Sequence, residues 1–231
     1  MRSGTAEGSM IDSSGDNMAI EKKKIIIVGC GPGAESYITP AAREAAQRAD
    51  VLIVSRRLQD LFPEIAAERI DSGTDVEGTI DTMAARRDAG LQVVLLATGD
   101  PGIASLAQPV IRRFGRENCK VIPGISSVQV AFARLGVGWE DARIVSAHSR
   151  DPEESTADLR DTDKLAILGG REGSLRWAQG LIAEMAGRRV FLCEELTLPD
   201  EKVREVQAHE LTEVPVSSRA IILVIKKELL A

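Results

Sequence analysis

Residues 25–33 read Ile25-Ile26-Ile27-Val28-Gly29-Cys30-Gly31-Pro32-Gly33, and this stretch decides the fold class of the 231-residue chain. Its continuous β-branched run predicts a strand that is buried on both faces, as in a parallel sheet covered by helices. The glycines that follow permit positive φ angles and let a ligand approach the backbone closely. Open α/β sheets bind ligands at this end of their strands, so the loop is a candidate binding site.

Strands and helices alternate on both sides of this stretch, from residue 22 to residue 122. Apolar runs predict further strands at 51–54, 93–96 and 120–122. Helices are expected at 40–49, 78–87 and 103–114, the first with Thr39 as N-cap and Pro40 as its first residue. Such alternation requires crossover connections and indicates a parallel sheet.

The pattern changes after Pro123-Gly124. Helices are predicted at 126–135 and 174–185, and strands at 144–145, 165–168, 190–192 and 221–225. Alternation in 203–206 indicates an antiparallel or edge strand, and the acidic stretch 151–163 reads as irregular. We therefore expect an α/β protein of two α/β domains, with a parallel sheet in residues 22–122 and a mixed sheet in residues 123–231. The Ser- and Gly-rich residues 1–21 are expected to be a disordered tail.

Composition restricts the function classes. The net charge of −6 gives no overall attraction to nucleic acid or to an anionic membrane. No run approaches the roughly 18 apolar residues of a membrane span, and the tail lacks a secretory signal. The cysteines, Cys30, Cys119 and Cys193, are too far apart for a zinc motif. We expect a cytoplasmic protein without a metal site.

Two further loops follow predicted strands. They read Thr98-Gly99-Asp100-Pro101 and Pro123-Gly124-Ile125-Ser126-Ser127. Each has two interpretations, because Asp100 and either serine could cap a helix or contact a ligand. One such loop is a weak signal. Three in order, each after a strand of one sheet, indicate a binding site.

A dinucleotide site is the main alternative for the first loop, since Gly29, Gly31 and Ala34 satisfy G-x-G-x-x-A. The predicted helix starts too late, at Thr39-Pro40, to place its N-terminus on a pyrophosphate. No acidic residue ends the second strand, although Arg56 or Arg57 could hold a 2′-phosphate. An NADP-dependent oxidoreductase therefore stays open as an alternative.

Together, the three loops resemble those of the tetrapyrrole methylase family, a GxGPG loop, a GDP loop and a PG-[IT]-[ST]-[SA] loop. The resemblance extends from Lys24 to Lys226 and implies the two-domain tetrapyrrole methylase fold, a homodimer, and S-adenosylmethionine held as methyl donor between the domains. Carried over by position, it implies donor contacts from Pro32, Gly99, Asp100, Ile103, Ser126, Ser127, Leu168 and Ala220.

Ser146-Ala147-His148-Ser149-Arg150 is similar to the S-x-H-G-R segment of the subgroup that methylates C-5 of precorrin-7 or cobalt-precorrin-7, with Ser149 in place of Gly. This resemblance implies a precorrin acceptor and a separate C-15 methyltransferase and decarboxylase as partner. For the acceptor we expect contacts from Gly31, Gly33, Arg150 and Arg171. His148 is either a catalytic residue or a structural one. Another acceptor, such as ribosomal RNA, or a sensor that binds the donor without turnover, stays open.

Overall fold

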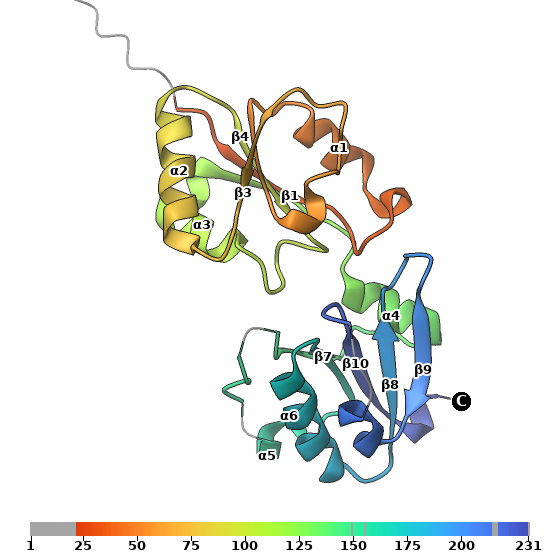
Figure 1. The fold of residues 1–231 in the computed structure, drawn as a ribbon. Helices are drawn as coiled ribbons and strands as arrows, with labels where there is room; N and C mark the ends of the chain where they lie inside the picture. The colour runs from red at the N-terminus through yellow and green to blue at the C-terminus, as the bar shows by residue number, and fades with distance from the viewer. Residues whose placement is uncertain (1–21, 149, 155, 214–216, 231) are drawn as a thin grey trace, which may run out of the picture.

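The computed structural model describes residues 22–148, 150–154, 156–213 and 217–230. Within them the chain forms two five-stranded sheets, one after the other along the sequence (Figure 1). Helices cover both sheets, as expected for an α/β protein. The predicted tail, residues 1–21, lies outside the described residues.

The first sheet has the strand order β3-β2-β4-β1-β5, and all of its pairs are parallel. Its strands are β1 (Ile25–Gly29), β2 (Val51–Val54), β3 (Glu68–Asp71), β4 (Val93–Ala97) and β5 (Cys119–Ile122). Its helices are α1 (Pro40–Ala46), α2 (Val76–Asp88) and α3 (Ala107–Phe114), with 3₁₀ turns at Glu35–Tyr37 (η1), Arg56–Leu58 (η2) and Arg116–Asn118 (η3). The predicted parallel sheet is confirmed.

Alternate residues of β1 face opposite layers of the first sheet. Ile26 and Val28 pack with α1, whose buried face consists of alanines. Ile25 and Ile27 pack with α2 and α3 on the other face. Because both faces are covered, the strand needs no polar residues, and this explains its continuous apolar run.

The second sheet is mixed and has the order β6-β7-β10-β8-β9. Only the β6–β7 pair is parallel. Its strands are β6 (Arg143–Ser146), β7 (Lys164–Leu168), β8 (Arg188–Glu194), β9 (Lys202–Val206) and β10 (Ile221–Lys226). The remaining helices are α4 (Ser127–Leu135), α5 (Thr156–Leu159) and α6 (Glu172–Ala183), with 3₁₀ turns at Ala208–Thr212 (η4) and Lys227–Leu229 (η5).

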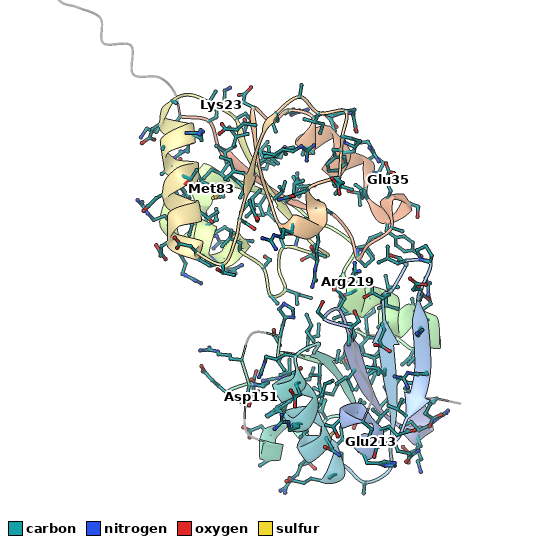
Figure 2. All side chains as sticks on the ribbon, viewed as in Figure 1. Lys23, Glu35, Met83, Asp151, Glu213 and Arg219 are labelled. Atoms are coloured by element: carbon teal, nitrogen blue, oxygen red, sulfur yellow. The ribbon has the colours of Figure 1, made fainter. Side chains whose placement is uncertain are left out.

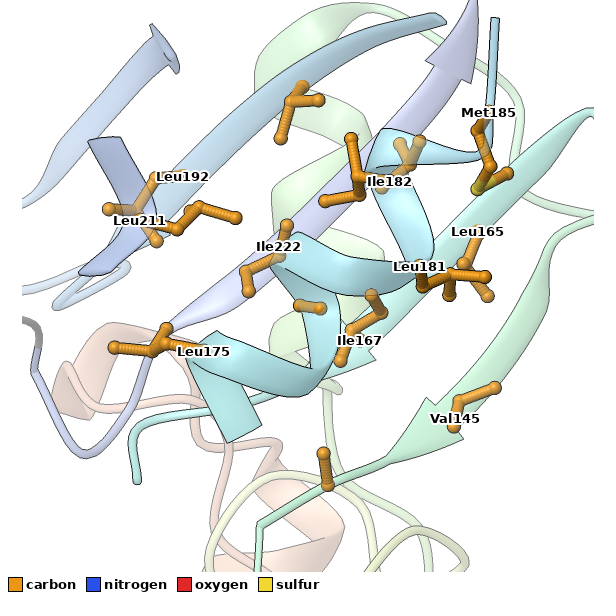
Figure 3. Packing of buried hydrophobic residues seen from close by; sticks show 14 of the residues in the cluster. Val145, Leu165, Ile167, Leu175, Leu181, Ile182, Met185, Leu192, Leu211 and Ile222 are labelled. Atoms are coloured by element: carbon orange, nitrogen blue, oxygen red, sulfur yellow. The ribbon is translucent and has the colours of Figure 1, made fainter. Parts of the chain in front are cut away.

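Two apolar layers enclose this second sheet. Leu181 and Ile182 of α6 pack over Ile167 and Ile222 (Figure 3). On the opposite face, Phe132 of α4 is fully buried against the other side of the same strands. Helix α4 thus links the two halves, since it follows the last strand of the first sheet and packs on the second.

The structure differs from the predicted elements in three places. Helix α3 begins at Ala107 rather than 103, because Ala104 has a φ of 45°, outside the helical region. Strand β3 was not predicted, since Glu68–Asp71 is a largely polar edge strand. The stretch 151–163 contains a short helix, α5. In the described ranges, every helix is too short or too polar to cross a bilayer.

Candidate functional site

The three glycine-containing loops meet at the carboxyl ends of β1, β4 and β5. Gly31 and Gly99 form a two-way backbone bridge, with Gly99 N donating to Gly31 O at 2.7 Å and Gly31 N donating to Gly99 O at 3.2 Å. Both glycines have positive φ, 76° and 69°, which a side chain would strain. The first and second loops therefore form one backbone unit.

The third loop packs against the first two through Gly29 and Gly124. A Cβ on Gly29 would lie 2.4 Å from Gly124 N, and a Cβ on Gly124 would lie 2.3 Å from Gly99 O. Neither distance is possible without moving backbone. Glycine is therefore required at both positions by the packing of the loops against each other.

Asp100 joins the second loop to the third. Its Oδ2 accepts a hydrogen bond from Gly124 N at 3.1 Å, and its Oδ1 accepts one from Gly102 N at 2.7 Å. Helix α3 begins seven residues later, at Ala107, so Asp100 does not cap it. The capping interpretation of Asp100 is wrong, and the carboxylate instead fixes the loop that a ligand would meet.

For the serines of the third loop, the structure supports helix capping. Ser126 is the N-cap of α4, where its side chain accepts from Val128 N at 3.1 Å and Gln129 Oε1 accepts from Ser126 N at 2.9 Å. Ser127 is the first helical residue. Capping does not remove them from the site, since both also border the cleft described next.

A cleft lies between the two sheets, lined by residues of both halves of the chain. All eight positions expected to contact a donor line it, and so does His148. The lining comprises Pro32, Arg57, Thr98, Gly99, Asp100, Ile103, Ala104, Ser126, Ser127, His148, Leu168, Gly169, Leu196, Ser218, Arg219, Ala220 and Ile221. Pro32 and Ile221, which are 189 residues apart in sequence, are thus brought together.

The four expected acceptor contacts are not part of this lining. Gly31 and Gly33 belong to the first loop, and a Cβ on Gly33 would meet the Leu198 side chain at 2.9 Å. Arg150 pairs with Glu153 at 2.7 Å on the surface, and Arg171 pairs with Asp151. A role for them toward an acceptor stays a prediction.

Two cleft arginines were not predicted as acceptor contacts. Arg57 extends from η2 and donates from Nη2 to Ser218 Oγ at 2.5 Å. Arg219 lies between the two halves (Figure 2) and pairs with Glu195. The sequence places Arg56 and Arg57 shortly after β2, where the dinucleotide alternative gave them a 2′-phosphate and not an acceptor carboxylate. The Ser218-Arg219 pair before β10 had no local signal.

His148 contacts the backbone of the cleft. Its Nδ1 lies 3.4 Å from Gly169 O. A carbonyl only accepts, so this contact requires the proton on Nδ1 and leaves Nε2 of the neutral ring as a proton acceptor. His148 therefore has the chemical capacity of a weak base.

The thiol of Cys30 is not suited to act as a base or a nucleophile. Burial raises the pKa of its thiol to about 12. The thiol is therefore protonated at neutral pH and is a poor nucleophile. Among the described residues no cluster of His, Cys, Asp or Glu could hold a metal ion.

The loop between β8 and β9 secures the first loop from the other half of the molecule. Ala34 N donates to Thr197 Oγ1 at 3.0 Å. Glu201 accepts from Arg134 Nε at 2.6 Å and from Thr197 N at 2.5 Å. The Arg134 guanidinium and the Thr197 N–H hold the pKa of Glu201 below its usual range. The second half thus fixes the position of the first loop over the cleft.

Comparison with known proteins agrees with this geometry. The model of a family described as tetrapyrrole (corrin/porphyrin) methylases matches residues 24–212. The cobalt-precorrin-7 C(5)-methyltransferase of Salmonella typhimurium is 34% identical over 181 residues, which are 78% of this chain and 88% of that protein. The precorrin-6Y C(5,15)-methyltransferase (decarboxylating) of Mycobacterium tuberculosis is 28% identical, over 78% of this chain and 46% of that protein.

Solved structures share the fold. A cobalt precorrin-4 methyltransferase superimposes with a TM-score of 0.76 at 24% identity, covering 90% of this chain and 96% of that one. A precorrin-6Y methylase from Archaeoglobus fulgidus gives a TM-score of 0.67 at 29% identity, with 88% and 97% covered. The dinucleotide interpretation of the first loop is therefore set aside. The chain belongs to the tetrapyrrole methylase family, whose members are S-adenosylmethionine-dependent methyltransferases.

Proposed function

We propose that this chain transfers the methyl group of S-adenosylmethionine to C-5 of precorrin-7 or cobalt-precorrin-7, in cobalamin biosynthesis. One observation carries the proposal: the eight positions expected to contact the donor all line a single cleft in a chain 34% identical to a C(5)-methyltransferase. Some relatives methylate other acceptors, such as the cobalt-precorrin-4 C(11)-methyltransferase of Methanocaldococcus jannaschii, so the proposed regiochemistry depends on the C(5)-methyltransferase relatives.

The shape of the cleft supports a donor site. Gly99 has no heavy atom closer to a hypothetical Cβ than Ser127 N at 4.0 Å, so its backbone has room for a close neighbour. Asp100 fixes the loops around it, and Ile103 and Leu168 provide apolar surface. Residues of this kind suit a ligand with both polar and apolar parts.

For methyl transfer, the protein mainly has to align the donor with the acceptor. The sulfonium of the bound donor supplies a methyl group that is already activated for in-line displacement. Pro32 and its loop would orient the reacting centres, and the bound donor and acceptor would displace water from the cleft. His148 Nε2 would accept the proton released when the methylated carbon restores conjugation.

For the surroundings of the enzyme, we expect a cytoplasmic homodimer and a separate protein that methylates C-15 and removes a carboxyl group. The precorrin-6Y relative is named a C(5,15)-methyltransferase, and the match covers 46% of it. Size-exclusion chromatography with light scattering tests the dimer, and a monomer at micromolar concentration would contradict it.

Calorimetry with S-adenosylhomocysteine tests donor binding first. We expect a dissociation constant of about 1–100 μM, as for ordinary enzyme ligands. Mass spectrometry of precorrin-7 incubated with enzyme and donor should then show a single added methyl group, and NMR should place it at C-5. Binding without methylation of any precorrin would contradict the proposed acceptor.

A further inference from the structure

Arg57 is a charged residue of the cleft that has no role in the methyl transfer proposed above. It lines the cleft from the first half, and among the described residues its recorded hydrogen bond is to a neutral partner, the Ser218 hydroxyl. The other cleft arginine, Arg219, is neutralised by Glu195. In the part of the chain that the structure describes, no carboxylate is recorded within ion-pair distance of Arg57.

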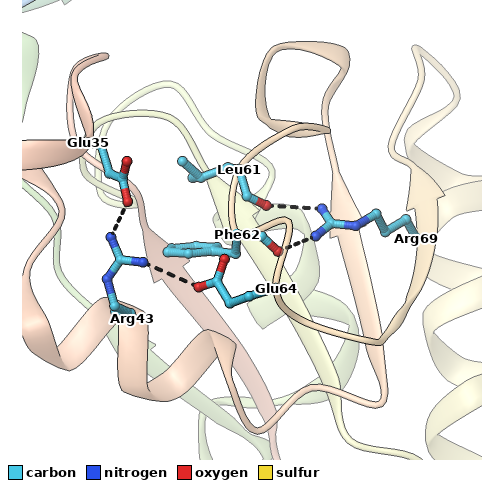
Figure 4. Close-up of polar contacts among 6 residues, drawn as sticks. All are labelled: Glu35, Arg43, Leu61, Phe62, Glu64 and Arg69. Carbon is cyan, nitrogen blue, oxygen red and sulfur yellow. Dashed lines mark hydrogen bonds and ion pairs between the residues drawn. The ribbon is translucent and has the colours of Figure 1, made fainter.

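The backbone around Arg57 is held firmly on its own half. Leu58 is buried, and its N donates to Ser55 O at 2.8 Å. Arg69 then fixes the following turn by donating to Leu61 O at 3.1 Å and to Phe62 O at 2.6 Å (Figure 4). The base of the Arg57 side chain is therefore in a fixed position at the edge of the cleft.

The same turn is anchored to the first glycine loop. Phe62 is buried with a φ of 59°, and the Arg43 guanidinium lies 5.2 Å from its ring centre. Arg43 also pairs with Glu35 at 2.6 Å and with Glu64 at 3.3 Å (Figure 4). Arg57 thus stands on a turn whose position is tied to the loop that carries Pro32.

Ser218 is equally fixed on the opposite half. Gly170 packs directly against it, since a Cβ on Gly170 would lie 2.4 Å from Ser218 O. The neighbouring Ser217 N donates to the buried Glu194 at 3.0 Å, and Ser217 Oγ donates to Glu195. The contact between Arg57 and Ser218 therefore joins two rigid supports across the cleft.

We infer that Arg57 binds a carboxylate of the macrocyclic acceptor, giving up its hydrogen bond to Ser218 when the acceptor enters; this inference rests on the proposed function. A guanidinium gains more from a carboxylate, through two parallel charge-assisted hydrogen bonds, than from one hydroxyl. An uncompensated cation at the cleft favours a polycarboxylate over a neutral ligand. Arg57 is thus a specificity-determining residue for the acceptor, and an unchanged affinity for S-adenosylhomocysteine in an Arg57 variant separates this role from binding of the donor's own carboxylate.

The test is steady-state methylation of precorrin-7 by wild type, Arg57→Met, Arg57→Lys and Ser218→Ala. We expect Arg57→Met to raise the KM for precorrin-7 about 10- to 100-fold, the range for loss of a charge-assisted pair. Arg57→Lys should restore part of this loss because it keeps the charge. Ser218→Ala should lower KM, because the acceptor no longer has to displace the hydroxyl.

The matched control is Arg56→Met. Arg56 adjoins Arg57, has a 90% exposed side chain and is absent from the cleft lining, so its variant should keep the wild-type KM. Calorimetry with S-adenosylhomocysteine should give wild-type affinity for Arg57→Met, which shows that this variant folds and binds donor.

Two results overturn the inference. If Arg57→Met keeps the KM of an active wild type, Arg57 does not bind the acceptor. If Ser218→Ala raises KM as much as Arg57→Met, Arg57 acts only by linking the two halves. Failure of the wild type to methylate any precorrin is a different result, which overturns the proposed function and this inference with it.

Discussion

The carboxylate of Asp100 accepts a hydrogen bond from the backbone N–H of Gly124 at 3.1 Å, across 24 residues of sequence. The same carboxylate accepts from Gly102 N on its own loop. One side chain thus holds the loops that follow β4 and β5 in a single arrangement. Because both loops border the cleft, this bond connects the packing of the sheet to ligand binding.

Replacing Asp100 by Asn should therefore weaken donor binding. The amide has one acceptor oxygen, so one of the two N–H groups would face an NH₂ group and lose its partner. We expect the dissociation constant of S-adenosylhomocysteine to rise about 10-fold, equivalent to loss of one hydrogen bond near 1.4 kcal/mol. Calorimetry measures this change. Asp60→Asn, an exposed position outside the cleft, is the control, and equal affinities for both variants would contradict the role of Asp100.

A glycine pair tests the loop packing itself. Gly124→Ala places a methyl group 2.3 Å from Gly99 O and should lower the free energy of unfolding by about 1–3 kcal/mol, as overpacking does. Gly180→Ala, in the middle of α6 with nothing within 4 Å of the new methyl group, should raise it by about 0.5–1 kcal/mol. Urea denaturation compares the two. If Gly124→Ala does not lower the free energy of unfolding relative to Gly180→Ala, the loops accommodate the added methyl group and the packing at Gly124 is not tight.

Local signals explain which parts of the fold could be predicted from the sequence. The β-branched run of β1 and the Thr39-Pro40 start of α1 are determined by their own residues, so both were predicted correctly. As expected of an N-cap, Thr39 Oγ1 accepts a hydrogen bond from Ala42 N at 3.1 Å. Strand β3 lacks an apolar pattern because it lies at the sheet edge. The late start of α3 depends on Ala104, whose positive φ has no sequence signal.

The site divides in the same way. Gly99 and Asp100 lie on a loop whose sequence is itself distinctive, and the structure places both in the cleft lining, as expected. Arg57 and Ser218 are 161 residues apart in sequence, and the local sequence around either residue gives no indication of their contact. Such a pair depends on how the two halves are placed, which short-range patterns do not specify. Arg150 was expected at the acceptor because it is a cation at the end of the Ser146–Arg150 segment, and Arg171 because of its charge; the structure places both outside the cleft lining.

Glu201 should make stability depend on pH. Its pKa is lowered in the folded state, chiefly by the hydrogen bond from Arg134, so its contribution is present above the ordinary value of 4.5 and is lost as pH falls through the lowered value. Glu201→Gln should lower the free energy of unfolding at pH 7 by about 1 kcal/mol. Urea denaturation at pH 7 and below pH 4 should show the difference from wild type shrinking with acid. A difference that stays constant over this range would exclude the ionised carboxylate as its source.

His148 offers the sharpest test of the chemistry. If Nε2 accepts the proton released from the methylated acceptor, His148→Asn should lower kcat about 100-fold, within the range for general-base catalysis. The affinity for S-adenosylhomocysteine, measured by calorimetry, should change far less, because the Asn amide can still donate to Gly169 O. His209→Asn is the matched control, since the chain has two histidines and His209 lies on η4, outside the cleft lining. An unchanged kcat in His148→Asn would assign His148 to the wall of the cleft and leave proton removal to solvent.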